Sequence, residues 1–554
     1  MHFAKKLFII NSEYKKGEIN LLVKCDGFWS YVCGEGIETV GDIKHYLTQT
    51  DYDFQTKKNI NTRFYLTHSK VLENEVIKFP TGLCNYILQK FNLEVEYKHN
   101  PDNYNYEKSE VLKVCNEIHN LNPSFEVRDY QVDAVLTSLT QYQSLIDASV
   151  GSGKTSIMAT VVKILAKTSK ILIINDNGLI LNQIYERLLS VGISKDDISN
   201  DISDLSKQIC VISSDMLHSR LVHGSDNNYI KQYLSELNVL ICDECQHLQA
   251  ISSFLPLLYV TPEVFHHIIG YSGSPFRNHK NPLSNATDKL TVGLLGMPAF
   301  TYDMKDAVGE ESIAKPHSYF INYNGVKPNI DTDNYYVLYN RNIQNNWARN
   351  NSGIAMLEFL NQYKLKTLAL FNHVERHALP ILKKLAEKKV NALLIRGGAG
   401  VKKGIKQCVI YKYVVEDKKL VLKEETGSID TMVEALKNDC NIILASSILN
   451  EGVDVSLFDA GVLFSGGKSP ISLIQQVGRV SRKKSQGLNV SLIIDFKDTN
   501  CTGMFINQYN KRKQLLTQQG VQNFENVQNF IEFVKEVSYN KYHTDESKER
   551  ETNM

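Results

Sequence analysis

The stretch Ala148-Ser149-Val150-Gly151-Ser152-Gly153-Lys154-Thr155-Ser156 decides the fold of this chain. A short apolar run, Leu145-Ile146, precedes it, and an apolar stripe at helical spacing follows it as far as Lys167. Glycines in such a loop let the backbone turn tightly and bring its N–H groups against phosphate oxygens, while the helix start adds partial positive charge. The stretch therefore predicts a strand, a phosphate-binding loop and a helix that together hold a nucleoside triphosphate.

The side chains of this loop have separate expected roles. Lys154 would reach the β- and γ-phosphates, and the Thr155 hydroxyl would hold Mg²⁺. Ala148 replaces the first glycine of the common pattern. The alternative is a plain Gly-Ser turn before a core helix, which the strand-to-helix context of Gly-Ser-Gly-Lys-Thr disfavours. The residues expected to surround the phosphates are Gly151, Ser152, Gly153, Lys154, Thr155 and Ser156.

Composition limits the classes of protein to consider. The 554 residues are enough for three to four domains of about 150 residues each. A net charge of +1 excludes a polycation that coats nucleic acid by bulk charge, so any such binding must use local patches. Ten scattered cysteines without a secretory leader predict reduced thiols and a cytoplasmic location. No run approaches the roughly 20 apolar residues of a membrane helix, so no membrane partner is expected.

Residues 119–310 alternate short apolar runs with helical patterns, which is typical of a parallel sheet covered on both faces by helices. Ligand chemistry then belongs at the carboxyl ends of the strands. The expected strands are Leu145–Ile146, Ile171–Ile174, Cys210–Ser213, Val239–Cys242 and Ile268–Tyr271.

Two of these strands end in polar residues. After Val239–Cys242, Asp243 would hold Mg²⁺, partly through water, and Glu244 would polarise the attacking water. Cys242-x-x-Cys245 with His247 offers a zinc alternative, but no second pair with finger spacing follows. After Ile268–Tyr271, the hydroxyls of Ser272-Gly273-Ser274 could bond the neighbouring carboxylate strand, although a simple turn explains them equally well.

Residues 311–500 repeat the alternation without a second phosphate loop, which predicts a second α/β domain. An insertion near 397–427 contains a predicted hairpin, Val409–Val415 with Leu420–Lys423. Gln475–Arg482 is expected on a helix that starts near Pro470. Arg479 and Arg482 are three residues apart, so both would project from one helix face toward phosphate charge. The alternative is a basic surface patch with Lys483 and Lys484.

Residues 1–118 predict a small α+β domain with short strands, among them Lys6–Ile10, Leu21–Lys24 and Glu94–Tyr97. A basic and aromatic stretch could bind phosphates and stack on bases, or could be a solvated sheet edge. Residues 501–554 predict a helical extension whose charged end, Asp545–Glu551, is expected to be disordered. The candidate nucleic-acid contacts are Lys57, Lys58, Arg63, Phe64 and Tyr65.

The order of these motifs over residues 125–495 resembles the superfamily 2 helicases and translocases. The likeness is greatest to the group that holds the bacteriophage UvsW helicase and the RecG-like and XPB-like enzymes. It implies two tandem RecA-like parallel-sheet domains preceded by a small α+β nucleic-acid-binding domain. The stretch Phe79-Pro80-Thr81-Gly82-Leu83 resembles part of that small domain. The motifs are Tyr130-Gln131, Gly151–Thr155, Asp243–Gln246, Ser272–Ser274, Glu451–Asp454 and Gln475–Arg482.

The resemblance also implies roles for single residues, with ATP and Mg²⁺ as cofactors. Gln131 would read the adenine beside Arg128 and Tyr130, and Ser272 and Ser274 would couple nucleotide state to movement. Gly452 and Asp454 would lie between nucleotide and nucleic acid. One departure is Asn175-Asp176-Asn177, which stands where the family usually has Pro-Thr. The expected catalytic residues are Lys154, Asp243, Glu244, Gln475, Arg479 and Arg482.

The implied activity is ATP-dependent unwinding, annealing or branch migration of duplex or branched DNA, in recombination, repair or replication. Other recombination or replication proteins are then expected partners, and the host cytoplasm the location if the chain is phage-encoded. Three alternatives stay open: an RNA helicase, a nucleic-acid-binding scaffold with a vestigial ATPase, and a restriction-type motor with a nuclease. The nuclease hypothesis rests only on Glu96-x-Lys98 in the small N-terminal domain.

Overall fold

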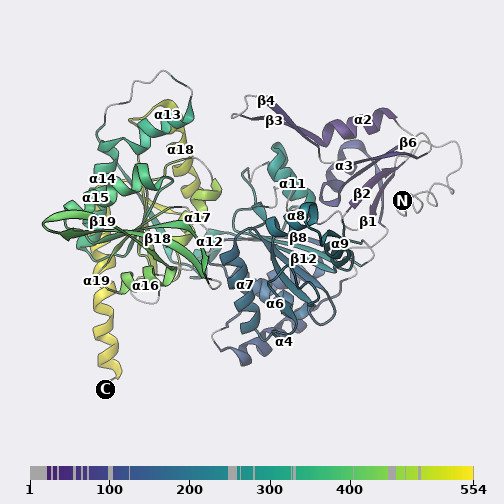
Figure 1. Ribbon diagram of the computed structural model, residues 1–554, viewed down its shortest axis with the longest axis horizontal. Helices are drawn as coiled ribbons and strands as arrows, with labels where there is room; N and C mark the ends of the chain where they lie inside the picture. Colours follow the sequence, from purple (N-terminus) through teal and green to yellow (C-terminus); the bar gives the residue numbers. More distant parts are fainter. Residues whose placement is uncertain are drawn as a thin grey trace. The chain divides into compact units, whose positions relative to one another are not determined.

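The computed structural model divides the chain into two compact units (Figure 1). One unit comprises Met1–Ala148 and Gly153–Thr301, and the other comprises Ser149–Ser152 and Tyr302–Met554. The structure describes residues 22–552 except 27–28, 34–36, 54–57, 64–65, 72–73, 98–103, 124, 248–258, 262–263, 279–280, 326, 328–331, 333, 403–404, 439, 447–456, 468–469 and 485–487. The expected strand Lys6–Ile10 lies outside these residues.

The N-terminal part of the first unit is a small α+β domain, as expected. Its five-stranded sheet has the order β5-β6-β2-β1-β7, and β3 pairs with β4 in a separate hairpin. Val23 and Phe79 are fully buried in its core. Its elements are β1 (Leu22–Asp26), β2 (Trp29–Cys33), α2 (Ile37–Tyr46), β3 (Thr48–Asp53), β4 (Lys58–Arg63), β5 (Leu66–Val71), β6 (Asn74–Pro80), η2 (Thr81–Leu83), α3 (Cys84–Phe91) and β7 (Glu94–Tyr97).

The rest of the first unit is built on a seven-stranded sheet with the order β10-β11-β9-β12-β13-β8-β14. All the pairings from β10 to β8 are parallel. The strands are β8 (Gln143–Ala148), β9 (Ile171–Asn175), β10 (Ile198–Ser199), β11 (Ile209–Ser213), β12 (Val239–Asp243), β13 (His267–Ser272) and β14 (Pro298–Tyr302).

Helices cover both faces of this sheet, because its central strands are rich in aliphatic residues and buried along most of their length, and would otherwise expose apolar surface. Figure 1 shows α4, α6 and α7 on one face and α8, α9 and α11 on the other. The helical elements are α4 (Lys108–Leu121), α5 (Asp129–Thr140), α6 (Lys154–Leu165), α7 (Gly178–Ser190), α8 (Ser214–His223), α9 (Asn227–Ser235), η3 (Cys245–His247), η5 (Pro282–Ser284) and α11 (Ala286–Leu295).

The second unit contains a nine-stranded sheet with the order β19-β18-β17-β20-β16-β21-β22-β15-β23. Its strands run parallel from β17 to β23, which confirms a second parallel-sheet domain. The strands are β15 (Lys315–Ile321), β16 (Thr367–Leu370), β17 (Ala392–Lys402), β18 (Ile405–Glu416), β19 (Lys419–Gly427), β20 (Ile442–Ala445), β21 (Ala460–Leu463), β22 (Val490–Phe496) and β23 (Gln522–Phe524).

The helices of the second unit include two short π-helical turns, η6 and η7. The last helix, α19, continues to Thr552 and so includes Asp545–Glu551, where the sequence predicts disorder. The elements are α12 (Met304–Gly309), α13 (Tyr335–Tyr339), η6 (Asn340–Gln344), α14 (Trp347–Gln362), η7 (Val374–Ala378), α15 (Leu379–Glu387), α16 (Ile429–Lys437), α17 (Pro470–Val480), α18 (Gly503–Gln518) and α19 (Val527–Thr552).

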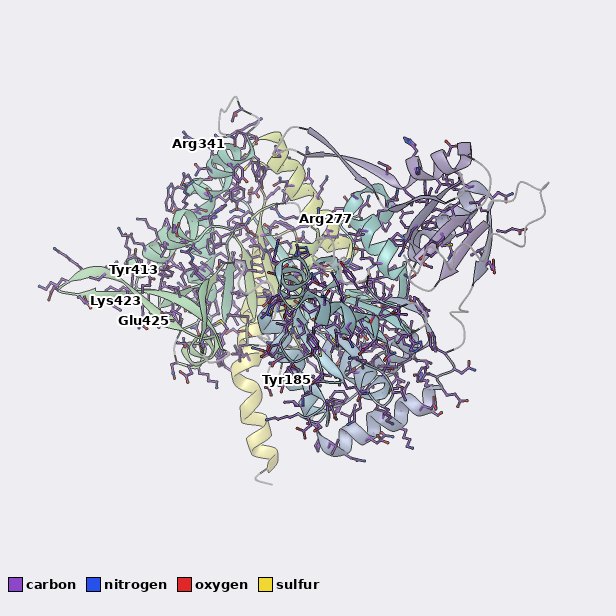
Figure 2. All side chains as sticks on the ribbon, turned by 45° about the vertical axis from the view of Figure 1, so that its right-hand side comes forward. Tyr185, Arg277, Arg341, Tyr413, Lys423 and Glu425 are labelled. Carbon is purple, nitrogen blue, oxygen red and sulfur yellow. The ribbon has the colours of Figure 1, made fainter. Side chains whose placement is uncertain are left out.

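The predicted insertion hairpin is present and is longer than expected. β17, β18 and β19 pair antiparallel and extend the sheet of the second unit at one edge. Figure 2 shows Tyr413, Lys423 and Glu425 along the outer part of this ribbon. Among the described helices none is long and apolar enough to span a bilayer.

A buried charge network lies at the carboxyl end of β22. Arg512 of α18 bonds both oxygens of Asp495, at 2.7 and 3.2 Å, and one oxygen of Asp498 at 3.0 Å. Arg349 of α14 bonds the other oxygen of Asp498 at 2.9 Å. Two cations and two anions therefore neutralise one another in a buried site, and they tie α18 to the core of the second unit.

Candidate active site

The phosphate loop lies between β8 and α6, as the sequence predicts. Gly151 and Gly153 have φ values of +90° and +79°, in the left-handed region that favours glycine. The Ser152 N–H donates to the Ser149 carbonyl at 3.1 Å, which closes the turn. The Lys154 ammonium donates to the Ala148 carbonyl at 3.0 Å, so it reaches back over the loop.

Gln131 supports this loop from α5. Its side-chain oxygen accepts from the Arg128 N–H at 2.9 Å, in a capping arrangement at the helix start. Its amide nitrogen occupies the space that a side chain on Gly153 would need. Gln131 and Tyr130 are both buried, at 5% and 7% exposure. Gln131 therefore packs against Gly153 of the phosphate loop, independently of any contact with a nucleotide base.

Arg187 of α7 is a neighbour of the loop that no sequence signal indicated. Its guanidinium donates to the Ser156 hydroxyl at 2.8 Å and stacks over the Phe125 ring at 4.4 Å. Burial lowers the pKa of Arg187. The arginine thus ties the first turn of α6 to the segment before α5.

Asp243 is the last residue of β12 and Glu244 follows it, at the carboxyl end of the first-unit sheet. Burial raises the pKa of Asp243 to about 7, the Glu244 carboxylate adds to that effect, and Lys154 and Asn175 act against it. Glu244 has a φ of +49°, an uncommon backbone state for a residue with a side chain. Such strain often accompanies functional sites.

A chain of hydrogen bonds leads from Glu244 to the next strand. The Gln246 amide donates to the Glu244 carboxylate at 2.7 Å, and the Ser272 hydroxyl donates to the Gln246 side-chain oxygen. The Ser274 N–H in turn donates to the Ser272 hydroxyl at 3.0 Å. Ser272 is fully buried. The expectation that these hydroxyls bond the carboxylate strand is therefore met only for Ser272, and only indirectly through Gln246, whereas Ser274 joins the chain by its backbone N–H.

Asn175, the last residue of β9, also meets this strand. Its amide nitrogen lies 3.2 Å from the Asp243 carbonyl and 3.4 Å from the Asp243 carboxylate, and its oxygen accepts from the Asn177 N–H at 2.7 Å. In the sequence, Asn175 is distinguished only by its departure from the family pattern. The neighbouring thiols of Cys242 and Cys245 are buried, which raises the pKa of both.

Oxygen donors are the ligands that Mg²⁺ prefers, and the edge of this sheet supplies them. The Asp243 carboxylate at the end of β12 and the Thr155 hydroxyl in the first turn of α6 are the candidates, and both residues are partly exposed. This donor set fits a magnesium ion held by few protein ligands and several waters. Among the described residues no group of three or more His, Cys, Asp or Glu gathers as a metal site.

The second unit places Gln475 and Arg479 on α17, at 9% and 8% exposure. The expectation that Arg479 and Arg482 project from one helix face is wrong, because α17 ends at Val480. The next residues form a bridge instead: the Ala314 N–H donates to the Ser481 carbonyl at 3.0 Å, and Arg482 pairs with Ile313. Gly151 belongs to the same compact unit as Arg482, because Ser149–Ser152 are part of the second unit. A Cβ atom built on Gly151 would lie 3.9 Å from the Arg482 Cδ.

Several expected residues lie outside the described part of the chain, namely Gly452, Asp454, Lys57, Phe64, Tyr65 and Lys98. Lys58 and Arg63 are the end residues of β4, and Glu96 is exposed on β7.

Phe79-Pro80-Thr81-Gly82-Leu83 packs inside the first unit. Phe79 and Leu83 are buried, and a side chain on Gly82 would collide with the carbonyls of Val292 and Gly293 on α11. Lys289 of the same helix donates to the Tyr46 carbonyl at 2.6 Å. The motif is therefore a joint between the small domain and the first parallel sheet.

Comparison with known families finds two matches, one within each of the two parallel-sheet regions. Residues 124–276 match the family described as type III restriction enzyme, res subunit. Residues 356–484 match the helicase conserved C-terminal domain.

Single relatives are more distant. A protein of Sulfolobus islandicus filamentous virus that carries the provisional name helicase 22 is 24% identical over 397 residues, which are 67% of this chain and 64% of that protein. The structure of UvsW from bacteriophage T4 covers 91% of this chain and 99% of its own, at 16% identity and a TM-score of 0.39. Dbp5 of S. cerevisiae, bound to RNA and ADP BeF3, covers 77% of this chain and 97% of its own, at 11% identity and a TM-score of 0.49.

Proposed function

Because the chain belongs to the superfamily 2 helicases, we propose that it is an ATP-driven helicase or translocase that acts on duplex or branched DNA. The observation that carries this proposal is the bonded chain Glu244–Gln246–Ser272–Ser274. It connects the water-activating carboxylate to a neighbouring strand end, so a change at the nucleotide is transmitted to the protein. A simple ATPase has no need of such a link.

The residues of the first unit take the following roles. Lys154 neutralises phosphate charge, and backbone N–H groups of the loop and the start of α6 hold the β- and γ-phosphates. Asp243 and Thr155 would hold Mg²⁺, which would supply positive charge against the negative charge of the phosphates. Glu244 orients the attacking water and accepts its proton. Gln131 would bond the adenine while it braces Gly153.

Gln475, Arg479 and Arg482 complete the proposed mechanism from the second unit. Guanidinium groups stabilise the charge that develops on the transferred phosphoryl group, an effect worth about 10³–10⁵ in rate. Gln475 helps to order the water, and Gly452 and Asp454 respond to the nucleic acid. Alternate opening and closing of the two motor domains would then step two backbone grips along one strand.

The grips should bind mainly sugar and phosphate, so sequence preference should be low and salt dependence strong. We assign the small N-terminal domain the task of directing the motor to branched duplexes, with Lys58 and Arg63 of β4 among the candidate contacts. DNA is preferred to RNA here on the family resemblance alone, and both substrates belong in the test.

The test measures ATP turnover with no nucleic acid, with single-stranded DNA, forked DNA, four-way junctions and structured RNA. We expect strong stimulation by forks or junctions and loss of at least about 100-fold in turnover for Lys154→Ala, since the lysine meets the reacting phosphates. Lys167→Ala, in the exposed turn just after α6, is the control and should behave as wild type.

The outcomes separate the alternatives. Stimulation by RNA but not by DNA would make the chain an RNA helicase. Binding of nucleic acid without any ATP turnover would leave a scaffold, and Mg²⁺-dependent cleavage abolished by Glu96→Ala would identify a nuclease-linked motor. If Lys154→Ala retains full turnover, the phosphate-loop mechanism is wrong.

A further inference from the structure

Asn175 occupies the position at which β9 leaves the sheet, and it faces the carboxylate strand. β9 runs parallel to β12, with Ile174 opposite Cys242, so the next residues along, Asn175 and Asp243, end adjacent strands side by side. Asn175 is only 3% exposed. A buried amide at this edge must satisfy its polar atoms within the protein.

The hydrogen bonds settle which way the amide points. The Asn177 N–H can only donate, so the atom that meets it at 2.7 Å is the Asn175 side-chain oxygen. The other end of the amide is then the NH₂ group, which faces the Asp243 carbonyl at 3.2 Å and one carboxylate oxygen at 3.4 Å. Both Asn175 contacts fall on the residue that the proposed mechanism assigns to Mg²⁺.

We propose that Asn175 is a positioning residue that holds the Asp243 carboxylate in the orientation in which it accepts Mg²⁺, an inference that rests on the proposed ATPase function. A carboxylate with one oxygen tied to a fixed donor loses rotational freedom before the metal arrives, which lowers the entropic cost of binding. The amide is uncharged, so it orients the carboxylate without competing with the metal for its charge. Outer partners of metal ligands typically contribute 10–100-fold in metal affinity.

The proposal also accounts for the departure from the family pattern at this position. A proline at the end of β9 has no side-chain donor and could not reach Asp243. In this chain the strand end therefore serves the nucleotide site of its own sheet. Asn177, two residues further on, fixes the amide through its N–H and so contributes to the same arrangement.

A control residue for Asn175 lies at the opposite end of the strands of the same sheet. Asn238, just before β12, also uses both ends of its amide: its oxygen accepts from the Lys170 N–H at 2.7 Å, and its nitrogen donates to the Val264 carbonyl at 2.9 Å. It has the same chemistry and the same number of partner residues, but it lies at the amino end of the strands. Asn238→Leu therefore reports the cost of losing such an amide without touching the site.

The experiment titrates Mg²⁺ against binding of a fluorescent ATP analogue, with thermal melting of each variant alongside. For Asn175→Leu we expect the Mg²⁺ midpoint to rise about 10-fold, in the range quoted for outer partners, while binding of the analogue without Mg²⁺ is unchanged. Asn238→Leu should lower the melting temperature and leave the Mg²⁺ midpoint where it is. Asn175→Ser, which is smaller and too short to reach Asp243, should shift the midpoint like Asn175→Leu and serves if the leucine variant does not fold.

An unchanged Mg²⁺ midpoint in a folded Asn175 variant overturns the proposal, and so does an equal shift in the Asn238 control. These outcomes differ from a failure of the proposed function, in which wild-type protein would show no Mg²⁺-dependent nucleotide binding at all.

Discussion

Ser272 shows how a single hydroxyl connects two strand ends. It donates to Gln246 and accepts from the Ser274 N–H, and it is fully buried. Removal of its oxygen leaves the Gln246 side chain without that partner, and a neutral buried hydrogen bond of this kind contributes about 1 kcal/mol. The proposed ATP hydrolysis at Lys154 and Asp243 does not require the Ser272–Gln246 hydrogen bond. The connection from Glu244 to β13 does require it.

For Ser272→Ala we therefore expect uncoupling. ATP turnover should stay within about fivefold of wild type, while DNA unwinding per ATP falls by 10-fold or more, because the two functions no longer share the bonded chain. Unwinding of a labelled fork and phosphate release, measured in parallel, check this. Ser138→Ala is the matched control, since Ser138 is an equally buried serine that bonds Tyr271 on the same strand. Equal losses of unwinding in both variants would contradict the prediction.

At the scale of elements, the start of β13 carries a buried titratable group. His267 is 2% exposed, its ring nitrogen lies 2.9 Å from the Gln141 carbonyl, and its ring lies 4.3 Å from that of Tyr104. Burial lowers the pKa of His267 to about 4, from an ordinary value of 6.5. The unfolded chain therefore binds a proton at a higher pH than the folded chain does.

This difference predicts a pH dependence of stability. Between about pH 6.5 and pH 4 the unfolded state holds more protons at this site, so the free energy of unfolding falls as the pH falls. The loss attributable to His267 is on the order of 3 kcal/mol. In His267→Gln the slope of stability against pH over this window should be shallower, as measured by denaturant unfolding at each pH. Exposed His223→Gln on α8 should retain the wild-type slope, and a slope unchanged in both variants would exclude His267 as the cause.

At the scale of the whole molecule, the small N-terminal domain belongs to the same compact unit as the first parallel sheet. Gly82 approaches the backbone of α11 so closely that no side chain fits, and the Lys289 ammonium lies 4.8 Å from the centre of the Tyr46 ring. Burial lowers the pKa of Lys289 to about 8, and its hydrogen bond to the Tyr46 carbonyl holds the helix against the small domain. The small domain is thus joined to the motor through backbone contact.

Gly82→Ala should open this joint. The added methyl group has to displace the carbonyls of Val292 and Gly293, at a cost of about 1–3 kcal/mol. We expect faster proteolytic cleavage between the small domain and α5, reduced stimulation by forked DNA, and unchanged basal ATP turnover. Gly41→Ala is the control, because a side chain there meets no atom within 4 Å. Retention of full fork stimulation in a protease-sensitive Gly82 variant would show that the joint does not serve substrate choice.

Many features of the two parallel-sheet domains could be predicted from the sequence, because they depend on local patterns. The phosphate loop, the carboxylates after β12 and the strands of both sheets each depend on short-range patterns: glycines where φ is positive, apolar runs buried on both faces, and polar residues where a strand ends. Gly151 and Gly153 have the backbone that their identity requires. Local rules of this kind also identified the hairpin of β18 and β19, although not its full length.

What the sequence by itself determined is thus the fold class and the motifs, since each is encoded within a dozen neighbouring residues. Only the tertiary structure decided that α17 stops before Arg482, that Asn175 turns toward Asp243, that Arg187 reaches Ser156 and that Gly82 meets α11. Each of these depends on partners from tens to hundreds of residues away. Such contacts are set by which strand and helix ends the packed sheet brings together, and no local pattern carries that information.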